Sequence, residues 1–248
     1  MQTVHTKQRY SLIDSVRGFA IINMVLFHLY FDVAELFRLG FTINDTVIDV
    51  WQLFICTAFM IISGISLNFS HHALRNGIVL NLLGFLITAV TTLAVPSAQI
   101  HFGILNFLGC AILIIQPLRV YIDKISPEIA AAASALLFII LYGVPNGYIG
   151  LMQLRIFQLP DFLYQTDFLA YLGFPSKYFF SADYFPIIPF IFVFIFGYCL
   201  YHIIENRNLQ KYLYLKIPFI DFIGRHSLVI YMAHQPIHLR ERFFFLHI

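Results

Sequence analysis

Residues 184–203 read YFPIIPFIFVFIFGYCLYHI and contain no Asp, Glu, Lys or Arg. About 20 apolar residues in a helix cross the hydrocarbon core of a bilayer, because each residue adds about 1.5 Å. Working outward from this run, six more runs of similar length can be found at residues 12–33, 48–69, 76–95, 102–119, 127–144 and 219–238. We therefore predict an all-α, polytopic membrane bundle of about seven transmembrane helices, with residues 1–248 forming a single domain.

The composition of the whole chain agrees with this class. Hydrophobic residues make up 60% of the 248 residues and charged residues only 11%, against roughly 25% charged in a soluble domain. The net charge of +2 and the lack of a basic run speak against a nucleic-acid partner. The three cysteines lie in apolar runs without CxxC spacing and are interpreted as small core residues. No histidine pair has a carboxylate at convincing ligand spacing, so no metal site is predicted.

The Lys and Arg residues that flank the spans indicate the orientation. The side of the N-terminus holds Lys7, Arg9, Arg75, Arg119, Lys124, Arg207, Lys211 and Lys216. The other side holds the smaller set Arg38, Arg155, Lys177, Arg240 and Arg242. Because cytoplasmic segments carry the excess of positive charge, we predict a cytoplasmic N-terminus.

The longest connection, residues 145–183, then lies outside the cytoplasm. It is rich in aromatic residues and proline. A long irregular connection of this kind is typical of a lid or a binding loop. The alternative interpretation is a re-entrant or interfacial segment with no role in recognition.

The first span carries a stripe of ionisable residues. At about 100° per residue, Asp14, Arg17, His28 and Asp32 fall within an arc of about 60°. Ionisable groups inside a membrane are costly, by about 2.5–3.5 kcal/mol each on insertion scales, and a shared face lets them line a polar cavity. Asp32 follows His28 by four residues, within reach of one imidazole nitrogen.

Two interpretations of this stripe stay open. In the first, His28 is a general base that Asp32 orients in a water-accessible pocket. In the second, the stripe is an interhelical hydrogen-bonding seam, and Asp14 pairs with Arg17 at the membrane boundary. We prefer the catalytic interpretation for His28 and the structural interpretation for Asp14 and Arg17.

Polar residues elsewhere define smaller candidate groups. His71, His72 and Arg75 form a basic group that binds the phosphates of a nucleotide cofactor or merely reflects the positive-inside bias. Asn106 lies within an apolar run and needs a polar partner. In the last span Ser227, Tyr231 and His234 fall within about 60° of one another, and His234 is either a substrate ligand or a buried hydrogen-bonding residue.

Five blocks of sequence carry a resemblance to a known family. They are IDSVRGFAIINMVLFHLYFD, FMIISGISL, IHFGILNFLG, DYFPIIPFIFVFIFG and FIGRHSLVIYMAHQPI, between residues 13 and 237. Arg17, ten residues and His28 resemble the R-x10-H motif of the acyltransferase-3 proteins and the wider transmembrane acyltransferase superfamily. The five blocks together are more similar to the catalytic domain of heparan-α-glucosaminide N-acetyltransferase and its small bacterial relatives. Those relatives often have His where this chain has Asn106.

The resemblance implies an enzyme that takes an acetyl group from acetyl-CoA at the cytoplasmic side. The acceptor would be a hydroxyl or amine of a glycan or lipid-linked sugar on the other side, and the membrane a bacterial plasma membrane. His28 and Asp32 would then be catalytic, and Arg17 with His71, His72 and Arg75 would bind the cofactor. Asp14, Asn106, Ser227, Tyr231 and His234 would contact the substrate. Membrane lipid is an expected partner, and a homodimer stays open.

Two other classes of function remain alternatives. The polar stripe of Asp14, Arg17, His28 and Asp32 also suits a small transporter or flippase that relays protons or substrate. Many transporters contain inverted repeats with broken helices, and no internal repeat is visible in this sequence. A non-catalytic membrane subunit that modulates a partner is the third hypothesis.

Overall fold

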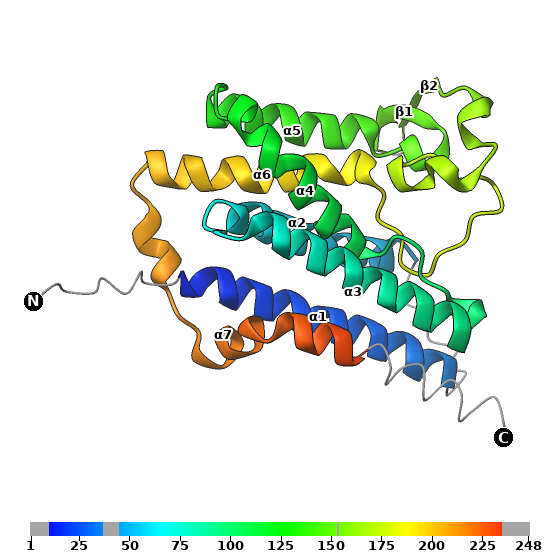
Figure 1. Ribbon diagram of the computed structural model, residues 1–248, viewed down its shortest axis with the longest axis horizontal. Coiled ribbons are helices and arrows are strands. Elements are labelled where there is room, and N and C mark those ends of the chain that lie inside the picture. Colours follow the sequence, from blue (N-terminus) through cyan, green and yellow to red (C-terminus); the bar gives the residue numbers. More distant parts are fainter. Residues whose placement is uncertain (1–9, 37–44, 153, 235–248) are drawn as a thin grey trace, which may run out of the picture. The chain divides into compact units, whose positions relative to one another are not determined.

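The computed structural model describes residues 10–36, 45–152 and 154–234 (Figure 1). Contacts divide the chain into two compact units. The first contains Met1–Phe59 and Ile204–Ile248, the two ends of the sequence, and the second contains Met60–Ile203. The prediction of a single domain stays a prediction.

Six helices in the described part of the chain are long and apolar enough to cross a membrane. They are α1 (Ser11–Leu36), α2 (Asp45–Leu67), α3 (Ala73–Ala94), α4 (Ile104–Ile122), α5 (Pro127–Leu141) and α6 (Ile187–Asn206). Each coincides with one of the predicted spans, so the all-α membrane bundle is confirmed. Exposed Leu, Ile, Val and Phe side chains cover α3 in particular, as expected of a surface that faces lipid.

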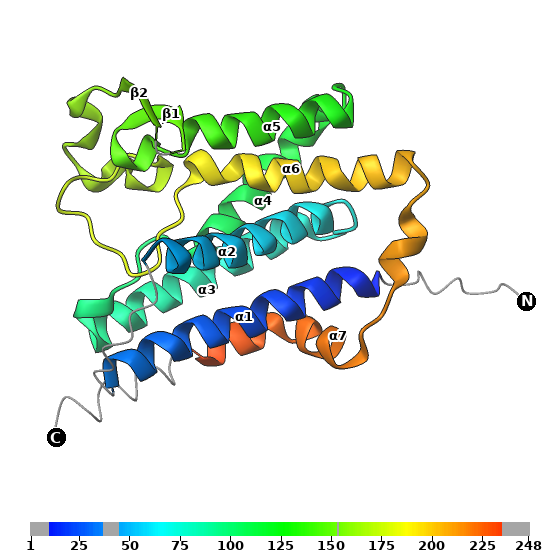
Figure 2. The ribbon, with the colours of Figure 1, turned by 180° about the vertical axis from the view of Figure 1, so that it is seen from behind.

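In the first unit α1 lies beside α7 (Pro218–Arg225), as Figures 1 and 2 both show. The Ile217 backbone N–H donates a hydrogen bond to Ser15 Oγ at 3.4 Å, and farther along α1 the His28 ring meets the ring of His234, which follows α7 in the chain. The residue numbers rise together on the two segments, so they run in parallel. This direction agrees with the prediction that the two segments belong to the first and seventh of alternating spans. The short helix η5 (Gln210–Tyr214) also packs on α1.

The seventh predicted span is not one continuous helix. Helix α7 ends at Arg225, His226 is non-helical, and helical backbone resumes over 227–234. The reason lies at His226, whose Nδ1 bonds to the Phe222 carbonyl oxygen at 2.8 Å while its backbone N–H bonds to Ile223. The carbonyl that would accept the regular helical bond is therefore engaged by a side chain. Residues 235–238 of this span lie outside the described residues.

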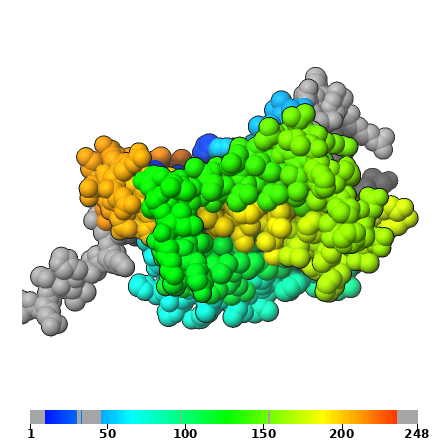
Figure 3. All heavy atoms as spheres, turned by 90° about the horizontal axis from the view of Figure 1, so that it is seen from above, coloured from blue at the N-terminus to red at the C-terminus, as the bar shows by residue number. Residues whose placement is uncertain are grey.

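In the second unit α3 and α4 form an antiparallel pair. After α5, the segment predicted as an irregular loop contains a hairpin of β1 (Tyr148–Leu151) and β2 (Leu154–Gln158). The strands pair antiparallel, Tyr148 opposite Gln158, with a bulge after Ile149. Figure 3 shows the hairpin atoms continuing the surface of α5. Short 3-10 helices complete the unit: η1 (Pro96–Ala98), η2 (Val144–Asn146), η3 (Asp161–Tyr164) and η4 (Asp167–Leu172).

The end of the 145–183 segment is fixed to the start of α4. Asp183 Oδ2 accepts a hydrogen bond from the Ile104 backbone N–H at 3.1 Å, which satisfies one of the unpaired amides at the helix N-terminus. The Ala182 N–H donates to the Gln99 carbonyl at 2.9 Å. Within the second unit, this end of the segment is therefore part of the packed structure.

Candidate functional site in the seam between α1 and α7

Two glycines bring the backbones of α1 and α7 into direct contact. A Cβ atom at Gly18 would collide with the Ile220 carbonyl oxygen, and one at Gly224 would collide with the Asp14 carbonyl oxygen. Small residues at helix interfaces in membranes permit this approach. We call the surface where α1 meets α7 and residues 227–234 the α1–α7 seam.

Near the N-terminal end of the seam, Asp14 and Arg17 form an ion pair. Arg17 Nη1 donates to Asp14 Oδ1 at 2.8 Å, and the Asp14 side chain is only 4% exposed against 24% for Arg17. Because Asp14 is buried, the guanidinium compensates a carboxylate that would otherwise be costly in this environment. The structure thus contains the pair that one interpretation of the stripe predicts.

A second carboxylate in the seam was not selected from the sequence as a site residue. Asp221 is fully buried and pairs with Arg225, one turn later on α7. Its other oxygen, Oδ1, makes no hydrogen bond within the described residues. Asp221 and Arg225 repeat on α7 the pairing of Asp14 and Arg17 on α1.

The two histidines that belong to separate stripes in the sequence meet in the seam. The ring centroids of His28 and His234 are 5.0 Å apart, at 47° between planes. His28 is partly buried and His234 is buried. The Tyr231 ring lies 5.2 Å from the His234 ring. His28 belongs to the first predicted span, and Tyr231 and His234 belong to the last. The seam therefore brings together residues of two spans that are far apart in the sequence.

The tautomer of His234 follows from its partner. His234 Nδ1 lies 2.5 Å from the Tyr231 carbonyl oxygen. A carbonyl only accepts hydrogen bonds, so Nδ1 carries the hydrogen, and the lone pair of the neutral ring is on Nε2. A neutral imidazole with this tautomer can accept a proton or a hydrogen bond at Nε2.

Phe27 links His28 to a contact between α1 and α2, because its ring lies 5.7 Å from the His28 ring. Trp51 Nε1 on α2 donates to Asn23 Oδ1 on α1 at 3.2 Å, and the Trp51 ring lies 5.4 Å from the Phe27 ring. Asn23 and Trp51 were not predicted as site residues. The available signal was an amide inside an apolar span together with the only tryptophan in the sequence.

The remaining predicted residues of the first unit are placed as follows. Asp32 belongs to α1, and its side chain lies outside the described residues. Ser227 is partly buried at the start of the helical stretch 227–234. The assignments of both residues stay predictions.

The predicted basic group lies in the second unit. His71 and His72 are exposed in the turn before α3, and Arg75 is exposed in the first turn of that helix. The positive end of the helix dipole adds to their charge, so this turn is suited to an anion. Binding of a cofactor there stays a prediction.

Asn106 is also in the second unit, in the contact between α3 and α4. It is 1% exposed, its Nδ2 donates to the Asn81 carbonyl at 3.4 Å, and it packs directly against Gly84. Asn81 Oδ1 in turn accepts from Cys110 Sγ at 3.4 Å. The polar partner that Asn106 needs is thus a backbone carbonyl of the neighbouring helix α3. The contact of Asn106 with the substrate stays a prediction.

The fold and this seam define a class, the polytopic helical membrane proteins with ionisable groups buried between spans. A sequence profile described as "Heparan-alpha-glucosaminide N-acetyltransferase, catalytic" matches residues 9–236. The chain therefore belongs to this family, which indicates an acetyltransferase that is integral to a membrane. No curated protein and no solved structure shows a significant match to the chain. The similarity to the acyltransferase-3 motif stays a prediction.

Proposed function

We propose that the chain transfers an acetyl group from acetyl-CoA to a hydroxyl or amine of an extracytoplasmic glycan or lipid-linked sugar. The observation that carries this proposal is the pair of His28 and His234 in the α1–α7 seam, with ring centroids 5.0 Å apart. An acyl transfer of this kind needs a base near neutral pH, and histidine is the side chain best suited to that task.

In the proposed step His28 takes the proton of the acceptor hydroxyl or amine. The acceptor oxygen or nitrogen attacks the thioester carbonyl, the bond between carbon and sulfur breaks, and CoA leaves as the thiolate. The proton held by His28 then passes to that thiolate. A route through an acetyl-His intermediate is the second option, and it uses the same side chain as nucleophile.

Asp32 and His234 support His28 in this proposal. Asp32 is four residues after His28 on the same helix, the spacing at which a carboxylate reaches an imidazole. His234 and Tyr231 are proposed to contact the acceptor, because the His234 ring lies against the His28 ring and the Tyr231 ring lies against the His234 ring. Ser227 and Asp14 are assigned to the substrate on their position in the same seam.

Cofactor binding is proposed separately for each unit. Arg17 is partly exposed, so its guanidinium can bind a phosphate oxygen in addition to Asp14. His71, His72 and Arg75 are exposed at the start of α3, where an anion is favoured. We also propose a cytoplasmic N-terminus in a bacterial plasma membrane, which puts the start of α1 and the turn before α3 on the side that holds acetyl-CoA.

The test measures CoA release by purified protein in detergent with acetyl-CoA, and with glucosamine as the acceptor probe. His28→Ala and His28→Gln are expected to lower turnover by about 10²- to 10⁴-fold, the usual contribution of a general base. Leu29→Ala is the matched control. Leu29 follows His28 on α1, and its side chain is 47% exposed.

Each result discriminates between the proposed classes of function. Loss of turnover in the His28 variants, with the Leu29 variant unaffected, supports the acetyltransferase. If the folded wild type neither binds nor consumes acetyl-CoA, a transporter or a partner subunit takes precedence, and substrate flux in liposomes becomes the next measurement. Retained turnover in His28→Ala would remove His28 from the mechanism.

A further inference from the structure

The β1–β2 hairpin folds back against the end of a membrane span. The candidate span of α5 extends over Pro127–Asn146, and β1 begins two residues later. The Met152 backbone N–H, at the tip of the hairpin, donates to the Ile139 carbonyl of α5 at 3.2 Å. This carbonyl is among the last four of the helix, which have no partner within it. The tip of the hairpin therefore lies level with residues inside the span.

Most of the apolar side chains of this hairpin are exposed. All five residues of β2 are exposed, with Leu154, Ile156 and Phe157 at 61%, 68% and 61%. Leu151 and Met152 at the tip are 47% and 37% exposed. Contiguous exposed apolar surface of this kind marks a site of contact with a membrane or a protein.

The backbone of β2 limits how deep the hairpin can lie. In the described part of the chain the sheet has two strands, so one edge of β2 has no strand beside it. An unpaired backbone edge costs several kcal/mol per group in hydrocarbon, where no water is available. The side chains disfavour water and the strand edge disfavours hydrocarbon, and the headgroup region of a bilayer satisfies both.

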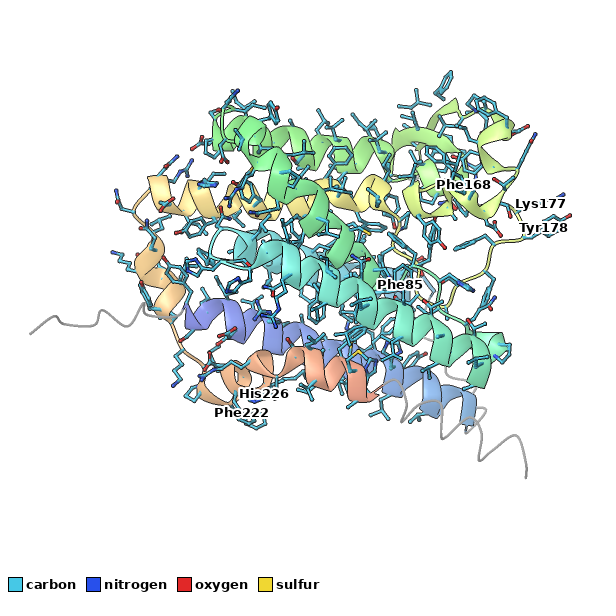
Figure 4. All side chains as sticks on the ribbon, viewed as in Figure 1. Phe85, Phe168, Lys177, Tyr178, Phe222 and His226 are labelled. Carbon is cyan, nitrogen blue, oxygen red and sulfur yellow. The ribbon has the colours of Figure 1, made fainter. Side chains whose placement is uncertain are left out.

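Cationic and aromatic residues of the segment agree with that depth. The Arg155 guanidinium lies 5.1 Å from the Tyr148 ring centroid, and the Tyr148 hydroxyl donates to the Met152 carbonyl at 2.9 Å. Lys177 lies 4.9 Å from the Tyr178 ring, and Figure 4 shows both side chains projecting outward. Tyr residues and long basic side chains are enriched at membrane interfaces, because each combines an apolar body with a polar tip.

We infer that the β1–β2 hairpin is an interfacial anchor that lies in the lipid headgroup region beside α5. Two observations favour lipid over a sugar ligand. The exposed apolar residues of β2 include the aliphatic Leu154 and Ile156, and the hairpin surface continues the exposed surface of α5, where Leu136 and Ile139 are 54% and 38% exposed. The inference goes beyond acetyl transfer and does not depend on it.

The experiment uses tryptophan fluorescence in lipid nanodiscs. Phe157→Trp adds a second tryptophan, and the wild type supplies the signal of Trp51 to be subtracted. The full-length protein is reconstituted with phosphatidylcholine brominated either near the headgroup or near the end of the acyl chain. Leu136→Trp, on the exposed face of α5, is the reference inside the span, and N-acetyltryptophanamide with iodide is the aqueous reference.

The expected result is a larger loss of intensity for Phe157→Trp with bromine near the headgroup than with bromine at the chain end. Iodide should quench it less than it quenches the aqueous reference. Ile156→Trp repeats the measurement if the first variant fails to fold. Quenching by iodide with no response to either bromolipid overturns the inference, and a shift on addition of glucosamine in that case points to a sugar surface. Strongest quenching from the chain end overturns it as well.

Discussion

The α1–α7 seam and the contact between α3 and α4 are both built on glycines and buried polar side chains, yet they differ in charge. Asn81 and Asn106 are neutral, and the hydrogen bonds of their amides stay within the α3–α4 pair. The α1–α7 seam instead buries Asp14 and Asp221. Interhelical amides contribute modestly to membrane-protein stability, whereas buried charges are expensive and are retained where they serve a function. Together with the contact between His28 and His234, this difference favours the α1–α7 seam over the α3–α4 contact as the site of the proposed function.

The largest effect on stability is expected from breaking the Asp221–Arg225 pair. Arg225→Met leaves a fully buried carboxylate without its guanidinium. Loss of one partner of a buried pair costs about 3–5 kcal/mol, and the partial exposure of Arg225 places the expected loss toward the lower value. The measurement is the midpoint of thermal unfolding in detergent. The double variant Asp221→Leu with Arg225→Met should recover most of the loss, and no recovery would show that the pair is not the cause.

The next effect compares one glycine from each contact. Gly224→Ala directs a methyl group at the Asp14 backbone carbonyl, whereas Gly84→Ala meets the side chain of Asn106. Overpacking costs about 1–3 kcal/mol, and a backbone atom yields less readily than a side chain. Gly224→Ala should therefore lower the thermal midpoint more than Gly84→Ala. Equal effects would indicate that the two contacts are equally rigid.

A smaller effect is expected from Asn106→Ala in the neutral contact. The variant loses one long hydrogen bond and some packing against Gly84, so stability should fall by about 0.5–1.5 kcal/mol. The turnover of acetyl-CoA per folded molecule then tests the predicted contact between Asn106 and the substrate. A clear fall in turnover supports that contact, whereas unchanged turnover leaves Asn106 with a structural role between α3 and α4.

The smallest effect concerns Tyr164, a residue outside both contacts. Burial raises the pKa of its phenol from the ordinary value of 10.0 to about 12, and its hydroxyl donates to the Val144 carbonyl at 2.5 Å. The neutral form is favoured in the folded protein, so its contribution is complete below pH 10 and is lost as pH rises through 12. The difference in thermal midpoint between wild type and Tyr164→Phe should shrink over that range. A constant difference would contradict this origin.

Much of the fold could be predicted because membrane spans leave a local signal. Length and apolar composition alone located α1 to α6, and the helical period placed Arg17 and His28 on one face of α1. The break at His226 was missed because a single side-chain hydrogen bond to the backbone causes it. The β1–β2 hairpin was missed because strands of four and five residues with a bulge give too short a pattern to detect.

The sequence predicts the two polar stripes of the candidate site separately, but it does not predict that they meet. Periodicity identified one polar stripe in the first span and another in the last, but it contains no information on which helices become neighbours. The contact between His28 and His234 depends on the close approach at Gly18 and Gly224, which is a tertiary property. Asn23 was missed for the same reason, since its partner Trp51 is on another helix.

The seam joins the first and the last helices of the chain, and this has a consequence for biosynthesis. His28 enters the membrane with α1, whereas its neighbour His234 is translated roughly 200 residues later. At about 5–20 residues per second, the ribosome needs roughly 10–40 s to reach it. During that interval the buried carboxylate of Asp14 has no α7 against which to pack. A nascent chain that stops before α7 would therefore expose a polar helix face to the translocon, a recognisable mark for membrane quality control.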